Sequence, residues 1–265
     1  MNATATSRLA RTDSFLADDG IRLAYFRWGS EDARIPVVLH HGFAASTEAN
    51  WVGTGMLAAL LEAGRSVISI DARGHGQSDK PHDAARYGEA RMARDLIGLI
   101  DHLDISEFDL FGYSMGAVVS LIVASEDVRV RRLIIAGVGE GVLETGGVDM
   151  RVMDREAIVA ALLTDDPASV STPGVAEFRQ FAETMGCDLK ALAAQASRMF
   201  DHSIPLNRIA AASMVLAGDK DPLARHPERL AAAIPRGHCI TVPGDHLGAV
   251  RQPRFIEVAL EFLGR

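Results

Sequence analysis

The sequence predicts an α/β fold in which a mostly parallel sheet is flanked by helices. Short apolar segments alternate with segments of helical length over the first half of the chain, which is the rhythm of repeated strand–helix units. Polar or glycine-rich stretches follow several of the apolar segments directly, as loops do at the carboxyl ends of parallel strands. A chain of 265 residues with 48% hydrophobic residues is long and apolar enough for one large domain with a sizeable core.

The first four predicted strands lie within the first 70 residues of the chain. Residues 12–17 and 21–28 flank Asp18-Asp19-Gly20, a hairpin turn signal, so we expect an antiparallel pair there. Residues 35–39 and 66–70 are continuous apolar runs, typical of central strands that are covered on both faces.

Two helices and two further strands follow, which brings the predicted sheet to six strands. We expect one helix over residues 51–63, closed by Gly64, and a second over 87–103, where apolar residues recur at helical spacing. A short buried strand begins at Phe108, and another covers residues 133–138.

The strand–helix rhythm stops at Glu140. From there to about residue 208 no convincing strand occurs, and the helix-like stretches are 154–163, 175–185 and 189–200. A segment of about 65 residues would have only a marginal core of its own. We therefore expect residues 141–208 to form a helical cap, or lid, inserted after the sixth strand into a core domain made of residues 1–140 and 209–265.

The sheet then resumes. Residues 213–217 and 239–242 predict the seventh and eighth strands, with a helix over 228–234 between them and a closing helix over 255–263. The complete prediction is an eight-stranded, mostly parallel sheet with helices on its faces.

The stretch Gly112-Tyr113-Ser114-Met115-Gly116 joins the strand at Phe108 to an apolar run over residues 117–124. G-x-S-x-G between a strand and a helix is the pattern of a nucleophile elbow, in which the serine sits on a sharp turn. Small neighbours leave room for the chain to double back. The alternative is a glycine-rich turn with an incidental serine. We expect Ser114 to be a nucleophile.

A serine nucleophile needs a base, and the base needs an acid that orients it. His246 is the candidate base because it lies just past the last strand, near the C-terminus. The acid is Asp219 or Asp221, both in Ala-Gly-Asp-Lys-Asp-Pro. We prefer Asp221, which sits two residues into the loop and can turn back toward a histidine. Either aspartate could instead be a turn or capping residue.

Attack on a carbonyl also requires donors for the developing oxyanion, each worth roughly 10² to 10³ in rate. The backbone N–H of Met115 follows the nucleophile and is one donor by construction of the elbow. The second should come from the loop after the third strand, and the N–H of Phe43 is the candidate. Phe43 could equally be a loop residue that plugs the core; both interpretations are compatible, since the donor is main-chain.

Charge and cysteine content exclude several classes of protein. A net charge of -8 without a Lys/Arg run argues against a nucleic-acid partner. No segment approaches ~18 uninterrupted apolar residues and the N-terminus lacks an apolar leader, so we expect no membrane span and a cytoplasmic protein. Cys187 and Cys239 show no pairing pattern, which favours a reducing compartment. Neither a metal-ligand spacing nor a dinucleotide fingerprint occurs, so we expect no metal and no cofactor.

Five motifs in this order, HHGF, DARGHGQSD, GYSMGA, AGDKDP and GDH, resemble the α/β-hydrolase superfamily over essentially the whole chain. They are most similar to its esterase, lactonase and C–C hydrolase branches with a helical cap. The resemblance implies Ser114 as nucleophile, Asp221 as acid, His246 as base, and the N–H groups of Phe43 and Met115 as oxyanion donors.

The resemblance also implies a structural role for the loop over residues 71–79. Arg73 and Asp79 are expected to brace that loop and not to act in catalysis. Two positions depart from the pattern: Ala117 stands where many relatives have a second glycine, and His40 is an additional histidine before His41.

We therefore expect a serine hydrolase that cleaves an ester or lactone bond of a small apolar substrate through an acyl-enzyme on Ser114. One alternative is C–C bond hydrolysis of a diketone-like substrate with the same triad. Another is a receptor-like protein that binds a ligand and turns over slowly. Haloalkane dehalogenases and epoxide hydrolases fit less well, because those relatives carry aspartate at the elbow. The sequence does not indicate an oligomeric state.

Overall fold

The computed structural model describes residues 11–30, 35–149, 151–152 and 154–264. It contains one eight-stranded sheet in the order β1-β2-β4-β3-β5-β6-β7-β8. Strands β1, β2 and β4 pair antiparallel, and all other neighbours pair parallel. The predicted mostly parallel sheet is confirmed. Its strands are β1 (Arg11–Leu16), β2 (Arg22–Trp28), β3 (Val37–His40), β4 (Val67–Ile70), β5 (Phe108–Tyr113), β6 (Val130–Ala136), β7 (Ala212–Gly218) and β8 (Gly237–Val242).

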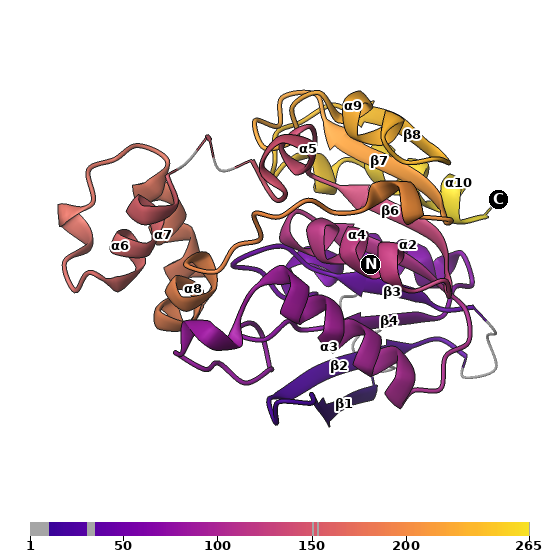
Figure 1. The fold of residues 1–265 in the computed structure, drawn as a ribbon, viewed down its shortest axis with the longest axis horizontal. Coiled ribbons are helices and arrows are strands. Elements are labelled where there is room, and N and C mark those ends of the chain that lie inside the picture. Colours follow the sequence, from indigo (N-terminus) through magenta and orange to yellow (C-terminus); the bar gives the residue numbers. More distant parts are fainter. Residues whose placement is uncertain (1–10, 31–34, 150, 153, 265) are drawn as a thin grey trace.

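Helices cover both faces of the sheet (Figure 1). Helices α3, α4 and α9 pack on one face, and α2 and α10 pack on the other. Among the described helices, none combines the length and the apolarity needed to cross a membrane. The helices are η1 (Glu48–Val52), α2 (Met56–Glu62), η2 (Ala84–Arg86), α3 (Glu89–His102), α4 (Met115–Glu126), α5 (Gly141–Thr145), α6 (Arg155–Leu163), η3 (Pro167–Ser169), α7 (Val175–Thr184), α8 (Leu189–Ala196), η4 (Leu206–Arg208), α9 (Pro227–Ala232), η5 (Ala249–Arg251) and α10 (Pro253–Gly264).

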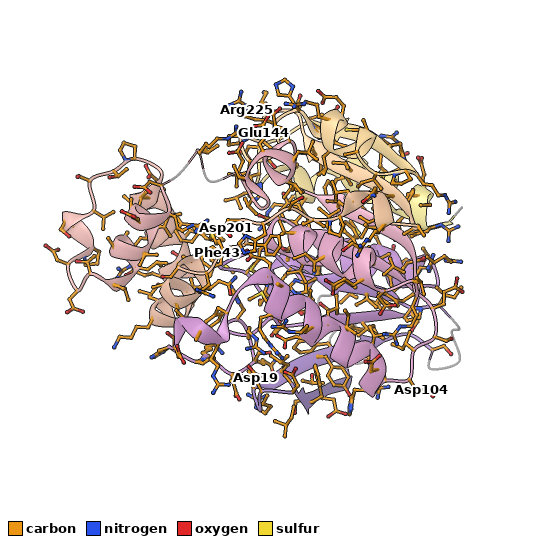
Figure 2. The ribbon with its side chains drawn as sticks, viewed as in Figure 1. Asp19, Phe43, Asp104, Glu144, Asp201 and Arg225 are labelled. Atoms are coloured by element: carbon orange, nitrogen blue, oxygen red, sulfur yellow. The ribbon has the colours of Figure 1, made fainter. Side chains whose placement is uncertain are left out.

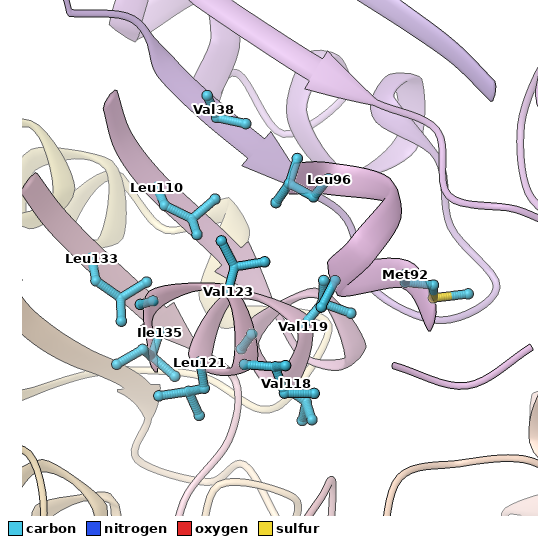
Figure 3. Packing of buried hydrophobic residues seen from close by; sticks show 14 of the residues in the cluster. Val38, Met92, Leu96, Leu110, Val118, Val119, Leu121, Val123, Leu133 and Ile135 are labelled. Carbon is cyan, nitrogen blue, oxygen red and sulfur yellow. The ribbon is translucent and has the colours of Figure 1, made fainter. Parts of the chain in front are cut away.

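Helix α4 lies at the centre of the larger hydrophobic core. Its residues from Met115 to Ser125 are all buried, and Figure 3 shows Val119 and Val123 between the sheet residues Val38 and Leu110 and helix α3. Each fully buried Val or Leu side chain contributes about 1.5–3 kcal/mol through the hydrophobic effect. The helix that begins at the elbow is therefore fixed firmly against the sheet.

Two predicted helices differ from the structure, and one helix was not predicted. The helix expected over 51–63 is two pieces, η1 and α2, because Gly55 adopts a left-handed conformation with φ of 86° and starts a new helix. The helix expected over 189–200 ends at Ala196. Helix α5 was not predicted, since five residues are too few to show a helical period.

The segment between β6 and β7 is helical, as predicted. Helices α6, α7 and α8 share a small hydrophobic cluster and lie to one side of the sheet, at the left in Figure 1. Helix α5 instead contacts helix α9, because Arg229 of α9 forms ion pairs with Glu140, which directly precedes α5, and with Glu144 in α5.

The strand order places two pairs of loops side by side. Strand β4 lies on one side of β3, and β5 with the later strands lies on the other side of β3. The direction in which successive strands are added therefore reverses between β3 and β5. His40 and Gly112 are register partners at the ends of those strands. Gly218 and Val242 are partners at the ends of β7 and β8. The loops that follow all leave the carboxyl edge of the sheet.

The loop over residues 71–79 is braced by ion pairs, as the resemblance implied for Arg73 and Asp79. The Arg73 side chain is fully buried, and its Nε donates to Asp95 at 2.7 Å while its Nη1 donates to Asp19 at 2.9 Å. Asp79 pairs with Arg22 on β2 at 3.1 Å. Both residues connect the loop to the N-terminal half of the sheet.

Candidate active site

Ser114 sits on a strained turn between β5 and α4. Its φ of 54° and ψ of -116° are rare for a residue with a side chain. The glycines on either side permit the turn: a Cβ at Gly112 would lie 2.1 Å from the Gly116 carbonyl oxygen, and one at Gly116 would lie 2.2 Å from the His40 carbonyl oxygen. The G-x-S-x-G spacing is thus required by close backbone packing.

A chain of two hydrogen bonds connects Ser114 to an acid through His246. The His246 Nε2 lies 3.1 Å from Ser114 Oγ, and its Nδ1 lies 2.8 Å from Asp221 Oδ2. A carboxylate can only accept, so Nδ1 carries the proton and donates to Asp221. The lone pair on Nε2 is then free to accept the Ser114 hydroxyl proton, which is the arrangement of a nucleophile with its general base.

Of the two candidate acids, Asp221 is the one beside His246. Its side chain is fully buried, and its second oxygen accepts the backbone N–H of Leu223 at 2.9 Å. Asp219 is exposed and accepts the N–H of Gly244 at 2.9 Å, which closes the loop after β8. Asp219 has the turn role that the sequence left open for either aspartate.

The loop after β3 lies directly against the nucleophile. A Cβ at Gly42 would be 3.4 Å from the Ser114 Cβ, and the Gly42 N–H is held by Asn50 Oδ1 at 2.9 Å. We find no hydrogen bond from the backbone N–H of Phe43 or of Met115 to a residue in the described part of the chain. Both predicted donors are therefore available in a loop and a helix start that meet at Ser114.

His41 and His75 hold the backbone around that loop. His41 Nδ1 lies 2.8 Å from the Gly42 carbonyl and its Nε2 accepts the Ala72 N–H at 3.0 Å. His75 Nδ1 lies 2.9 Å from the Arg73 carbonyl and its Nε2 accepts the Ala44 N–H at 3.3 Å. Each ring donates at one nitrogen and accepts at the other, so only the neutral ring satisfies both contacts. Protonation would put an N–H on the Nε2 of each ring, directly against the backbone N–H that this nitrogen now accepts.

Burial lowers the pKa of three neighbouring histidines well below the usual 6.5, to about 4 for His40, about 4 for His41 and about 3 for His75. His40 was unexplained in the sequence; it is a buried residue at the end of β3. Burial also raises the pKa of Glu89 on α3 to about 7, although the Phe200 N–H donates to its carboxylate. These four groups give the fold a pH dependence of known sign.

We expect the free energy of unfolding to fall as the pH drops from 6.5 to 4.5. The three histidines take up protons only on unfolding, so each destabilises the fold by about 1.4 kcal/mol per pH unit in this range. Glu89 has the opposite effect on stability, because its carboxyl takes up a proton at a higher pH in the native state than in the unfolded state. Its contribution cancels that of about one histidine. Urea unfolding at several pH values would measure the net slope.

The matched control for this slope is Glu89→Gln. The variant lacks the offsetting carboxyl, so its stability should fall more steeply with acid than that of the wild type, by about 1.4 kcal/mol per pH unit. A wild-type stability that rose between pH 6.5 and 4.5 would contradict the assignment of neutral buried histidines.

The site contains a contact that the sequence analysis missed. The Tyr113 hydroxyl donates to the backbone carbonyl of His246, and the two rings lie 5.4 Å apart. Gly137 at the end of β6 makes room for this pair, since a Cβ there would lie 3.2 Å from the His246 ring. Tyr113 precedes the nucleophile, and its only sequence signal was a polar aromatic residue at the end of a buried strand.

The helical segment between β6 and β7 contacts the site at Phe43. The Phe43 ring stacks on Phe178 of α7, with centroids 5.5 Å apart and planes 10° from parallel. Figure 2 shows Phe43 where the core faces helices α7 and α8. The residue whose N–H is the candidate oxyanion donor thus also contacts the helical insertion.

Comparison with known proteins identifies the family. Residues 35–250, which contain Ser114, Asp221 and His246, match the family described as the alpha/beta hydrolase fold. The chain belongs to the α/β-hydrolase family. A solved structure of a hydrolase from Pseudomonas aeruginosa PA01 superposes with a TM-score of 0.78 and 26% identity, covering 96% of this chain and 99% of that one.

Curated relatives of this α/β hydrolase carry out varied reactions. A dihydrolipoyllysine-residue acetyltransferase component of the acetoin cleaving system from Pseudomonas putida is 34% identical over 176 residues, 64% of this chain and 46% of that protein. A 2-hydroxy-6-oxo-2,4-heptadienoate hydrolase from Pseudomonas putida is 33% identical over 149 residues, 51% of this chain and 53% of that protein. The chain spans about half the length of these curated relatives.

Proposed function

We propose that this α/β hydrolase is a serine hydrolase that cleaves an ester or lactone bond of a small molecule through an acyl-enzyme on Ser114. The observation that carries the proposal is the continuous contact from Ser114 Oγ through His246 to the buried Asp221 carboxylate. A serine whose proton has a defined acceptor, on a strained turn at the edge of the sheet, has the arrangement needed to attack a carbonyl.

In the first half of the reaction, Ser114 Oγ forms a bond to the carbonyl carbon while its proton moves to His246 Nε2. The carbonyl oxygen becomes an oxyanion and accepts the N–H groups of Phe43 and Met115. When the tetrahedral species collapses, the C–O bond to the leaving alcohol breaks, and the alkoxide takes the proton from His246. With a lactone the alcohol stays attached to the acyl group.

In the second half, a water molecule attacks the acyl-enzyme. His246 Nε2 accepts a proton from the water as its oxygen bonds to the acyl carbon, and then returns that proton to Ser114 Oγ as the ester bond breaks. The carboxylic acid leaves, and the enzyme regains its starting state. Asp221 stabilises the positive imidazolium in both halves and keeps its own charge.

We propose that, within residues 141–208, helices α6, α7 and α8 act as the lid of this site. The stacked pair of Phe43 and Phe178 supports the assignment, because it links the oxyanion loop to helix α7. The Phe43 and Phe178 rings bring apolar surface to the junction of the lid and the core, which supports a small and largely apolar substrate. Cys187 and Cys239 are free thiols, which supports a reducing, cytoplasmic setting.

The second candidate function is C–C bond hydrolysis of a diketone-like substrate. The 33% identity to a 2-hydroxy-6-oxo-2,4-heptadienoate hydrolase over 149 residues favours it. The same three residues would serve, with a carbanion-like leaving group in place of an alkoxide. A substrate panel separates the two candidates.

The proposal is tested by the intact mass of the protein after treatment with a fluorophosphonate. Wild-type protein should gain the mass of one phosphonyl group, because Ser114 Oγ displaces fluoride, and Ser114→Ala should gain none. Hydrolysis of short esters, lactones and a vinylogous diketone then decides between the two candidates. An unmodified wild-type protein that also cleaves no member of the panel would refute the hydrolase proposal and favour a binding role.

A further inference from the structure

Gln195 on α8 is fully buried yet incompletely paired. Its Nε2 lies 3.6 Å from the Met115 sulfur, and its Oε1 has no hydrogen-bond partner in the described part of the chain. Three other buried side-chain atoms there also lack a partner, and all are N–H donors: Arg27 Nε, Trp51 Nε1 and Arg91 Nε. Gln195 Oε1 is the acceptor among them.

The orientation of the Gln195 amide follows from its neighbour. A thioether sulfur is a weak acceptor and cannot donate, so the NH₂ end of the amide faces Met115. The carbonyl end is then directed away from the sulfur and remains unpaired. Leaving such an acceptor buried without a donor costs about 1–3 kcal/mol. A leucine or methionine would fill a similar volume without that cost.

Gln195 lies between the lid helices and the nucleophile elbow. Its neighbours Ala191 and Ala194 belong to the core cluster that contains Met115, whereas Leu192 and Ala196 belong to the lid cluster. On the helix, Gln195 lies between these two groups, and its amide contacts the core through Met115. Its contact, Met115, is adjacent in sequence to Ser114, so Gln195 packs against the residue that directly follows the candidate nucleophile.

We propose that Gln195 Oε1 accepts a hydrogen bond from a hydroxyl group of the substrate, near the scissile carbonyl. The inference rests on the proposed serine hydrolase function and specifies its substrate class: hydroxy-substituted esters or lactones, in place of purely apolar ones. A bound hydroxyl would satisfy the one buried side-chain acceptor that has no partner among the described residues. A site built around such a contact discriminates against substrates that cannot donate.

The test compares matched 4-nitrophenyl esters. One set carries a hydroxyl on carbon 2, 3 or 4 of a butanoyl chain, and the second carries a methoxy group at the same carbon, which can accept but not donate. For at least one position, wild-type kcat/KM should favour the hydroxyl ester about 10- to 100-fold. In Gln195→Met the ratio of kcat/KM for the hydroxyl ester to kcat/KM for the methoxy ester should fall to about 1. Gln180→Met, at an exposed glutamine of α7, should keep the wild-type preference.

Thermal unfolding distinguishes a ligand contact from a structural role. Gln195→Met should melt at the same temperature as the wild type or higher, because it removes an unsatisfied acceptor from the free protein. A marked drop, or a hydroxyl preference that survives the substitution, would overturn the proposal. The proposal would also be overturned if the wild-type protein showed no preference for the hydroxyl ester at any of the three positions, as expected if Gln195 Oε1 binds only water.

Failure of this inference differs from failure of the proposed function. A protein that reacts with fluorophosphonate and cleaves butanoate, but ignores the hydroxyl, is a serine hydrolase without the Gln195 contact. If no ester is cleaved, binding of the hydroxy and methoxy amides to Ser114→Ala is measured by thermal shift, with and without Gln195→Met. If Ser114→Ala binds the hydroxy amide more tightly than the methoxy amide, and Gln195→Met removes this difference, the contact is supported even without catalysis. If Ser114→Ala binds the two amides equally, the contact is refuted.

Discussion

Replacing Ser114 with alanine is expected to lower kcat for ester hydrolysis by about 10⁴ to 10⁶. The variant loses the only atom that forms the acyl bond, and His246 Nε2 loses its hydrogen-bond partner. The phosphonyl adduct on the intact protein should vanish as well. Steady-state kinetics on 4-nitrophenyl butanoate measures the loss.

The substitution is a clean test because it leaves the backbone strain unchanged. Ser114 has a φ of 54°, and alanine also carries a Cβ, so both residues are strained to a similar degree. We therefore expect the melting temperature of Ser114→Ala to stay within a few degrees of the wild type. Near wild-type hydrolysis by a folded Ser114→Ala would show that another residue is the nucleophile.

The sheet and the elbow could be predicted because their signals are local. The strands at 35–39 and 66–70 are continuous apolar runs, and β3 and β4 are buried at every position. The glycines around Ser114 are needed for close backbone contacts within the motif and with the neighbouring strand. Sequence order then predicted which loops would meet, since the carboxyl ends of parallel strands share one edge.

Other features depend on contacts between distant segments and left no local signal. The Tyr113 hydroxyl reaches the His246 carbonyl across 133 positions of sequence, and Asn50 fixes Gly42 from the next helix. The unpaired oxygen of Gln195 becomes visible only when α8 is packed against Met115. Such residues resemble any other buried polar residue until the tertiary structure is known.

The choice between Asp219 and Asp221 depended partly on a local sequence signal and partly on a contact between distant segments. The sequence places both aspartates in the loop after the seventh strand, and Asp221 was preferred because it lies two residues into that loop, where it can turn back toward a histidine. The structure gives the reason: β7 ends at Gly218, so Asp219 still lies beside the end of β8 and accepts the Gly244 N–H. Only two residues later has the chain turned enough for a carboxylate to meet His246.

Asp221→Asn is expected to reduce kcat by about 10⁴. The Leu223 N–H should keep the amide oxygen on its side, because it now donates to Asp221 Oδ1 at 2.9 Å. The amide NH₂ then faces His246 Nδ1 and forces that nitrogen to accept, so the ring proton moves to Nε2. Nε2 can no longer take the Ser114 proton, although the protein should fold normally.

The matched control is Asp219→Asn in the same loop. An asparagine oxygen can still accept the Gly244 N–H, so kcat should change by no more than several-fold. Kinetics of both variants, with circular dichroism to verify folding, gives the answer directly. Loss of activity in Asp219→Asn with a mild effect in Asp221→Asn would reassign the acid. In that case the loop after β7 would have to rearrange when substrate binds, since Asp221 is the residue that contacts His246 here.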